Sequence, residues 1–445
     1  MSGSAGARFD AAPLPLDALA DAALEAIADL GAPAGVLWDA TPTALLDHRP
    51  LQAGRDRTPT PLAWARTLAA GFGSGRGARF VAVGDVLFSF DGANPEGTLR
   101  PVISVLAERR ATPAAEVAVR PGLRHLAAGL RQVRQSRAAL AERLGGDPPG
   151  SFDAALHAAV RAGARARAAL DRARPSLVVV ASQHSTTSRA LLRAARDRGV
   201  PTAYLPHAPA ADTHQYRDLP TDFAALRGPR EVDLYRALGI TGELAVAGNP
   251  QVEVAPPDAL DPDLPVVYAP RPLPVEVVRA QVADVQAASD RVIVSPHPRM
   301  RSDRYDALWP SGWSRHHGPT VELLRRGHPC VVQMSSGVAW EAMAHGVPVV
   351  ELPAPGGGGP LYPLIQAPYA KVCASSQEVA AAVDDCRRMA VDTDARAVLR
   401  AWAGEWCRAT GRAAAERAAT LIEEWSSIGD LRGPLLDHWA PEVHR

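Results

Sequence analysis

The sequence is poor in lysine, cysteine and aromatic residues, and it carries no net charge. Lysine occurs once, at Lys371, and 48 basic residues balance 48 acidic ones. A neutral chain creates no overall field that would attract nucleic acid. We therefore expect no nucleic-acid partner, and runs of arginine carry little weight in so arginine-rich a chain.

The four cysteines, Cys330, Cys373, Cys386 and Cys407, are scattered without the paired spacing of metal sites. Reduced thiols in the cytoplasm are the simplest interpretation. The first twenty residues lack the basic start and apolar centre of a signal peptide, and no apolar run approaches the roughly twenty residues of a membrane span. We expect a cytoplasmic protein without a bound metal or an integral membrane segment, and peripheral membrane contact stays open.

The length of 445 residues exceeds that of a usual single domain and predicts two domains of roughly 150 to 250 residues. The composition changes after Gly248-Asn249-Pro250, where a proline-rich stretch without periodicity is typical of a connector. We expect a first domain over residues 1–250, a linker over 251–265, a second domain over 266–420 and a helical tail over 421–445 that can pack back on the first domain.

Short apolar runs alternate with longer amphipathic segments, a pattern typical of βαβ units. It predicts an α/β fold with two Rossmann-like domains facing across a cleft. Helices are expected at 123–144, 152–173, 338–345, 378–389 and 395–425. Strands are expected at 35–38, 79–83, 86–90, 102–106, 177–180, 202–205, 244–246, 266–269, 292–295, 330–333, 347–351 and 371–373.

In open α/β sheets the ligand lies beyond the carboxyl ends of the strands. Polar residues that directly follow predicted strands are therefore the candidate site residues. By this criterion the candidates are Asp39, Asp85, His184, His207, Arg271, His297, Ser335 and Ser336.

The most informative stretch runs from Met334 to Val350, where a small-residue turn joins an apolar strand to a short helix. Backbone N–H groups and the helix dipole make such a turn a place for a phosphate, which would lie against Ser335, Ser336 and Gly337. The alternative is a plain helix cap. Glu341, in the early turns, could bind ribose hydroxyls or could simply suit the dipole.

A second strand end carries a histidine and arginine. His297 lies between Pro296 and Pro298, whose rings restrict the backbone on both sides, and Arg299 follows. A histidine there can donate a hydrogen bond or a proton to a phosphate oxygen. A structural histidine and a solvated arginine are the alternatives. Two strand ends suited to anions suggest one nucleotide site.

In the first half of the chain, His184 precedes a hydroxyl-rich helix start and His207 follows an apolar strand. Either could be a core or capping residue, and we expect at least one to touch substrate. The four-glycine loop at 356–359 lacks the Lys-Ser or Lys-Thr of a Walker loop and is either an exposed tip or a flap.

Taken in order, several short motifs between Leu177 and Leu352 resemble those of GT-B glycosyltransferases that make surface polysaccharides. This group includes bacterial sialyltransferases and polysialyltransferases, Kdo transferases and teichoic-acid glycerophosphotransferases. The similar segments are Pro206-His207-Ala208, where the family has Gln-His-Gly, then Gly248-Asn249-Pro250, Val267-Tyr268-Ala269-Pro270, Ser295-Pro296-His297-Pro298 and Ser335-Ser336.

The resemblance implies a metal-independent glycosyltransferase that uses a nucleotide-activated sugar as co-substrate and no other cofactor. His297, Ser335 and Ser336 would contact the donor's phosphate. From their places at the strand ends and the helix start, we expect Arg271, Arg299, Gly337 and Glu341 to bind the same nucleotide. The donor would be CMP-, CDP- or UDP-linked. The first domain would hold the hydroxyl acceptor, in polysaccharide or glycosylated-metabolite synthesis. A base must deprotonate that hydroxyl, and the candidates are Asp39, His184 and His207.

Two other functions remain open at this point. One is an enzyme similar to UDP-N-acetylglucosamine 2-epimerase on the same fold, which needs several acidic residues that the sequence does not make evident. The other is a non-catalytic nucleotide-binding protein on a GT-B scaffold.

Overall fold

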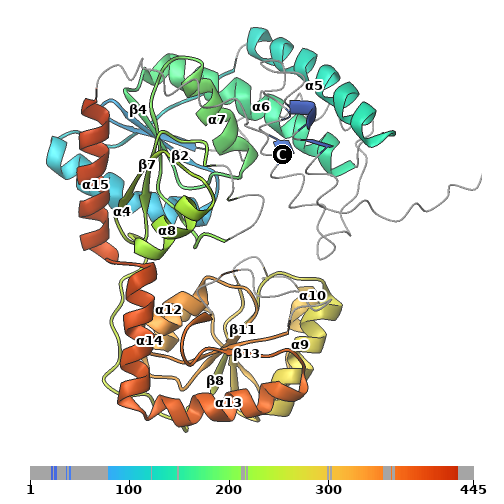
Figure 1. Cartoon of the computed structure of the whole chain (residues 1–445), viewed down its shortest axis with the longest axis vertical. Helices are drawn as coiled ribbons and strands as arrows, with labels where there is room; N and C mark the ends of the chain where they lie inside the picture. Colours follow the sequence, from blue (N-terminus) through green and yellow to red (C-terminus); the bar gives the residue numbers. More distant parts are fainter. Residues whose placement is uncertain are drawn as a thin grey trace, which may run out of the picture.

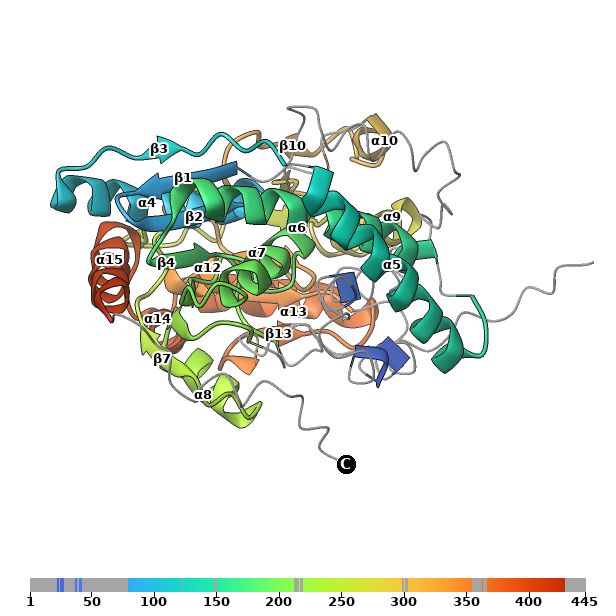
Figure 2. The same ribbon diagram turned by 90° about the horizontal axis from the view of Figure 1, so that it is seen from above.

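The computed structural model describes residues 79–428, except 122, 148–149, 212–215, 217–218, 298–299, 301–302, 354–361 and 363–365. It also describes residues 22, 23, 25–27, 37, 40 and 41. The described chain forms two sheets, each with helices on both faces, and Figure 1 shows one above the other. Figure 2 shows the same ribbon from above, turned by 90° from the view of Figure 1.

The first sheet has seven strands in the order β3-β1-β2-β4-β5-β6-β7. From β2 to β7 neighbouring strands are parallel, while β1 forms an antiparallel hairpin with β2. All four residues of β4 are buried, as expected for a central parallel strand. The strands are β1 (Arg79–Val83), β2 (Val86–Phe90), β3 (Ala115–Glu116), β4 (Leu177–Val180), β5 (Thr202–Tyr204), β6 (Phe223–Leu226) and β7 (Glu243–Val246).

Helices cover this sheet on two faces because successive strand residues point to opposite sides. Leu177 and Val179 join one apolar cluster with α4 and α15, whereas Val178 and Val180 join another with α6 and α7. The helices are α4 (Ala93–Arg110), α5 (Leu123–Leu144), α6 (Gly150–Ala173), α7 (Thr186–Arg196), α8 (Pro229–Ala237) and α15 (Gly411–Ser427).

The second sheet has six strands in the order β10-β9-β8-β11-β12-β13, and every pair is parallel. The strands are β8 (Val266–Ala269), β9 (Val292–Val294), β10 (Ser314–Arg315), β11 (Val331–Gln333), β12 (Val349–Glu351) and β13 (Lys371–Val372). The helices are α9 (Val275–Ala288), α10 (Asp303–Asp306), α11 (Thr320–Arg325), α12 (Val338–Ala344), α13 (Gln377–Ala390) and α14 (Thr393–Trp406).

This topology confirms the expected fold class, α/β with two Rossmann-like domains. Two predicted strands are wrong. Residues 102–106 lie inside α4, because Leu99, Val102, Ile103 and Leu106 are buried at the spacing of a helix face. The strand expected at 35–38 is contradicted at Leu37, which is helical.

The structure also differs from the prediction in one strand that was not predicted and in one helix that is divided in two. The strand β6, with the sequence Phe-Ala-Ala-Leu, was not predicted because its small central residues give little apolar signal. The single helix expected at 395–425 is two helices, α14 and α15, separated by Cys407–Thr410. This short break is where the chain passes from the second sheet back to the first (Figure 1).

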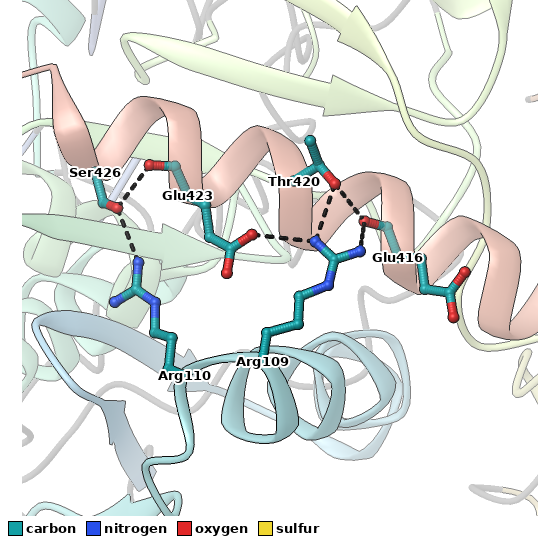
Figure 3. A network of polar contacts seen from close by, with 6 residues as sticks. All are labelled: Arg109, Arg110, Glu416, Thr420, Glu423 and Ser426. Carbon is teal, nitrogen blue, oxygen red and sulfur yellow. Dashed lines mark hydrogen bonds and ion pairs between the residues drawn. The ribbon is translucent and has the colours of Figure 1, made fainter.

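The last described helix, α15, belongs to the core of the first sheet. The Trp425 ring stacks on Phe223 with centroids 4.9 Å apart, and its Nε1 donates to Glu243 Oε1 at 3.0 Å. Polar contacts from Arg109 and Arg110, at the C-terminal end of α4, hold α15, as Figure 3 shows. Arg109 donates to Thr420 Oγ1 at 3.0 Å, to Glu423 Oε2 at 3.1 Å and to the Glu416 carbonyl at 3.2 Å.

The two connections between the sheets run side by side. Asn249 N donates to the Ala409 carbonyl at 2.8 Å, and Gly411 N donates to the Asn249 carbonyl at 3.0 Å. Gly248 has φ 113°, and a Cβ there would lie 2.3 Å from Ala409 O. The junction is thus a hydrogen-bonded pair of segments in close contact. No helix in the described part of the chain has the length and apolar character needed to cross a membrane.

Candidate functional site

The carboxyl edge of the second sheet gathers most of the expected donor-side residues. His297 follows β9, Arg271 follows β8 and Ser335 follows β11, and these three strands are neighbours. His297 N donates to the Pro270 carbonyl at 3.1 Å, and Arg271 Nη1 donates to the Ser335 carbonyl at 3.0 Å. The three strand ends are thus linked by hydrogen bonds along one edge, with a cationic side chain in the middle.

Two buried side chains hold the turn that carries the two serines. Ser335 has φ 47°, a left-handed conformation that is uncommon for serine. Glu351 Oε1 accepts from Ser335 N at 2.6 Å and from Ser335 Oγ at 3.2 Å. Gln333 Oε1 accepts from Ser336 N at 2.7 Å, and Gln333 Nε2 donates to Glu351 Oε2. Gln333 and Glu351 therefore fix a backbone that serine would not adopt by itself.

The two serines differ in what they can offer a ligand. Both backbone N–H groups, which the sequence suggested for phosphate, are already bonded to Gln333 and Glu351. Ser335 Oγ also bonds to Glu351. Ser336 Oγ accepts from Val338 N at 3.4 Å, and within the described residues its hydroxyl hydrogen has no acceptor. Ser336 is thus the hydroxyl suited to a ligand, and Ser335 is held by the protein.

The carboxyl edge of the first sheet carries the two expected histidines. His184 follows β4 and His207 follows β5, and their ring centroids are 6.2 Å apart. His207 N donates to the Ala181 carbonyl at 3.2 Å, and His207 Nδ1 contacts the same oxygen. Because a carbonyl can only accept, Nδ1 carries the proton, and a neutral ring then has its lone pair on Nε2.

Asp91 is a site candidate that the sequence interpretation missed. It directly follows β2, and its Oδ2 accepts hydrogen bonds from the hydroxyls of Ser188, at 3.0 Å, and Ser185. Its Oδ1 is buried without a hydrogen-bond partner among the described residues. The criterion of polar residues after strands could have found it. It selected Asp85 instead, which lies in the turn before β2 and pairs with Arg110 at 2.6 Å.

The two carboxyl edges meet where the domains touch. A Cβ at Gly337, just before α12, would lie 3.5 Å from Pro209 Cδ, two residues after His207. The guanidinium carbon of Arg227, which follows β6, lies 4.6 Å from the centre of the Trp340 ring in α12. The histidines of one domain and the Ser-Ser turn of the other therefore lie on either side of one contact. Asp39 and Arg299 lie outside the described residues.

Two acidic side chains near this contact have raised pKa values. Burial raises the pKa of Glu341 to about 7, against the opposing effect of the positive charge of Arg227. Burial likewise raises the pKa of Glu351 to about 7, although hydrogen bonds from Ser335 and Gln333 oppose the shift. Both carboxyl groups can therefore exchange protons near neutral pH. The described residues hold no group of three or more His, Cys, Asp or Glu that could bind a metal.

The raised pKa of Glu351 predicts a stability that falls as the pH rises. Between its usual pKa of 4.5 and about 7, the folded protein holds a proton that the unfolded chain has lost. We expect the free energy of unfolding to fall by about 3 kcal/mol across this window on account of Glu351. The measurement is urea unfolding of the wild type and of Glu351→Gln at several pH values.

The glutamine variant should remove this share of the pH dependence. Glu276→Gln is the matched control, because Glu276 is an exposed glutamate of the same domain. Equal pH profiles for the wild type and Glu351→Gln would contradict the assignment.

Comparisons with known proteins identify no family for this chain. Neither protein-family models nor curated proteins match the sequence. Among solved structures, the calicheamicin glycosyltransferase CalG4 is 19% identical with a TM-score of 0.41, over 61% of this chain and 79% of that one. A putative UDP-N-acetylglucosamine 2-epimerase from Listeria monocytogenes is 14% identical with a TM-score of 0.46, over 76% and 93%.

Acinetobacter baumannii MurG is 12% identical with a TM-score of 0.39, over 60% of this chain and 80% of that one. At these values the likeness says nothing about function. The fold class stands on the strand order of the chain itself.

Proposed function

We propose that this protein is a glycosyltransferase. It moves a sugar from a nucleotide-activated donor, held by the second domain, to a hydroxyl acceptor, held by the first. The observation that carries the proposal is the contact between the two carboxyl edges at Pro209 and Gly337. Each edge presents polar side chains suited to one half of such a transfer. The product would be a polysaccharide or a glycosylated metabolite.

The second domain supplies groups that suit a phosphate. Arg271 and His297 can donate charged or neutral hydrogen bonds to phosphate oxygens, and Ser336 can add its hydroxyl. Donors fixed in place before the reaction stabilise the negative charge that develops on the leaving nucleotide. We propose that these side chains allow the transfer without a metal, and that the donor is linked to a cytidine or uridine nucleotide.

The first domain supplies the base. His207 Nε2 takes the proton of the acceptor hydroxyl, and the acceptor oxygen forms a bond to the anomeric carbon of the sugar. The bond from that carbon to the phosphate oxygen breaks, and the nucleotide leaves with the electron pair. The hydrogen bond from Nδ1 to the Ala181 carbonyl supports this role, because it directs the lone pair to Nε2.

Nucleotide binding tests the donor half. In thermal-shift measurements with CMP, CDP, UDP and GDP, we expect one nucleotide to raise the unfolding midpoint. A ligand at a hundred times its dissociation constant adds about 2.7 kcal/mol of stability. His297→Ala should abolish the shift, whereas His317→Ala, at an exposed loop histidine, should retain it. A shift that persists in His297→Ala would remove His297 from the site.

A second candidate function is an epimerase similar to UDP-N-acetylglucosamine 2-epimerase. The observation in its favour is the pair of acids, Glu341 and Glu351, whose pKa values of about 7 suit proton transfer to and from carbon. Incubation with a UDP-sugar alone separates the two functions. An epimerase converts the sugar without an acceptor, while a transferase shows at most slow hydrolysis.

A further inference from the structure

Arg227 is buried, and its guanidinium group makes no hydrogen bond to the described residues. Its residue is 4% exposed, it directly follows β6, and its guanidinium stacks over the Trp340 ring at 4.6 Å. Within the described residues that guanidinium makes no hydrogen bond or ion pair, and its buried Nε has no partner. A stack on an aromatic face uses the charge of an arginine and leaves its N–H groups able to donate to another group.

Another buried arginine in the same structure shows what a purely structural role looks like. Arg396 is also 4% exposed and its Nε is likewise buried without a partner among the described residues, but its Nη1 donates to the Asp258 carbonyl at 3.0 Å and its Nη2 donates to the Pro257 carbonyl at 2.7 Å. Native proteins usually satisfy their buried polar groups in this way. Arg227 differs from Arg396 in its two Nη groups, which make no hydrogen bond to the described residues, and this difference is a reason to look for a ligand.

The acidic groups near Arg227 balance its charge but do not accept from its guanidinium. Both carboxylate oxygens of Glu231 accept backbone hydrogen bonds, from Ala210 N at 3.1 Å and from Arg227 N at 2.9 Å. Glu341 interacts with Arg227 through charge, without an ion pair between them. The backbone of Arg227 is thus held firmly, while its side chain keeps donors for another group.

Arg227 lies over a side chain of α12, the helix that follows the Ser-Ser turn. Trp340 and Gly337 are three residues apart and so lie on the same face of α12, one turn from each other. Gly337 follows Ser336, and Pro209 lies against it. We propose that Arg227 reaches across from the first domain and binds the phosphate of the nucleotide donor. This rests on the proposed function, and it makes the ligand shared between both domains.

The alternative explanation for Arg227 is that it only holds the two domains together, a role called a latch below. Arg230 provides a comparison on the surface, because it also follows β6 and stacks on a tryptophan of the other domain, but its side chain is 43% exposed. It lies 4.2 Å from the Trp402 ring centre, but its Nε pairs with Glu405 at 2.6 Å. A latch role predicts similar effects for both arginines, whereas phosphate binding predicts an effect for Arg227 alone.

The experiment is calorimetric titration of the wild type, Arg227→Gln, Arg227→Lys and Arg230→Gln with UDP, CDP and inorganic pyrophosphate. Arg227→Gln should weaken the nucleotide that binds, and pyrophosphate, by about 10-fold to 100-fold. Arg227→Lys keeps the charge over Trp340 and should lose less, which guards against a folding defect in the glutamine variant. Arg230→Gln should bind as the wild type does.

Each outcome decides the matter. Wild-type affinity in Arg227→Gln, or equal losses in Arg227→Gln and Arg230→Gln, would overturn the role of Arg227 and leave the proposed function intact. A wild type that binds nucleotide through Arg227 but transfers no sugar would overturn only the proposed function. A wild type that binds neither nucleotide nor pyrophosphate would overturn both.

Discussion

Replacing His207 with alanine should lower the rate of sugar transfer by about 100-fold to 10,000-fold, the usual contribution of a positioned general base. The affinity for the nucleotide should not change, because His207 is not among the side chains that we propose to bind the phosphate. The expectation rests on the geometry of the ring, whose Nδ1 is tied to the Ala181 carbonyl while Nε2 keeps the lone pair. The measurement is kcat and nucleotide affinity for the same protein preparation.

Two other histidines serve as controls for this variant. His317→Ala, in an exposed loop, should leave both quantities unchanged. His184→Ala tests the neighbouring ring, 6.2 Å from His207 between centroids. If His184→Ala abolished transfer while His207→Ala retained it, the assignment of the base to His207 would be wrong.

Gly248→Ala should lower the free energy of unfolding by about 3 kcal/mol or more. The added Cβ would lie 2.3 Å from Ala409 O and 2.9 Å from Ala414 Cβ, and backbone atoms cannot move aside as a flexible side chain can. The φ of 113° adds strain, since residues with a Cβ rarely adopt it. Overpacking typically costs about 1 to 3 kcal/mol, to which the backbone strain adds. Urea unfolding followed by tryptophan fluorescence measures the loss.

Alanine variants of two further glycines separate the effect of the steric clash from the effect of the backbone strain. A Cβ at Gly228 would lie 2.4 Å from the Trp406 carbonyl carbon with an ordinary extended φ, so Gly228→Ala isolates the clash. Gly239 has φ 85° with open space around it, so Gly239→Ala isolates the backbone strain. If Gly248→Ala were no worse than Gly239→Ala, the close contact at the junction would not limit stability.

The sequence predicted those parts of the fold in which one segment alone carries the signal. Runs such as Leu177–Val180 and Val266–Ala269 are rich in valine, continuous and buried, and both are strands in the structure. The run from Val102 to Leu106 failed because its neighbours continue the helical spacing in both directions. The strand Phe223–Leu226 was missed because its burial comes from Trp425 and other distant residues rather than from its own alanines.

The candidate site follows the same rule. Polar residues after strands predicted Arg271, His297, Ser335 and Ser336, which the structure brings to one edge. Gln333 and Glu351 were not predicted, because their function depends on a contact between two strands 18 residues apart. Arg227 was not predicted either, since its interest comes from burial beside Trp340 and from a lack of partners, which no local pattern contains.

The placement of α15 has a consequence for the order in which the chain can fold during synthesis. The helix supplies Ala415, Ala419, Ile422 and Trp425 to the apolar core of the first sheet, yet it lies near the far end of the chain. Domains made first by the ribosome usually complete their folding first. Here the earlier half must wait with Phe223 and its neighbours uncovered until the later half has emerged. Nascent chains that stop before Gly411 should therefore depend on chaperones to a greater degree than the released protein does.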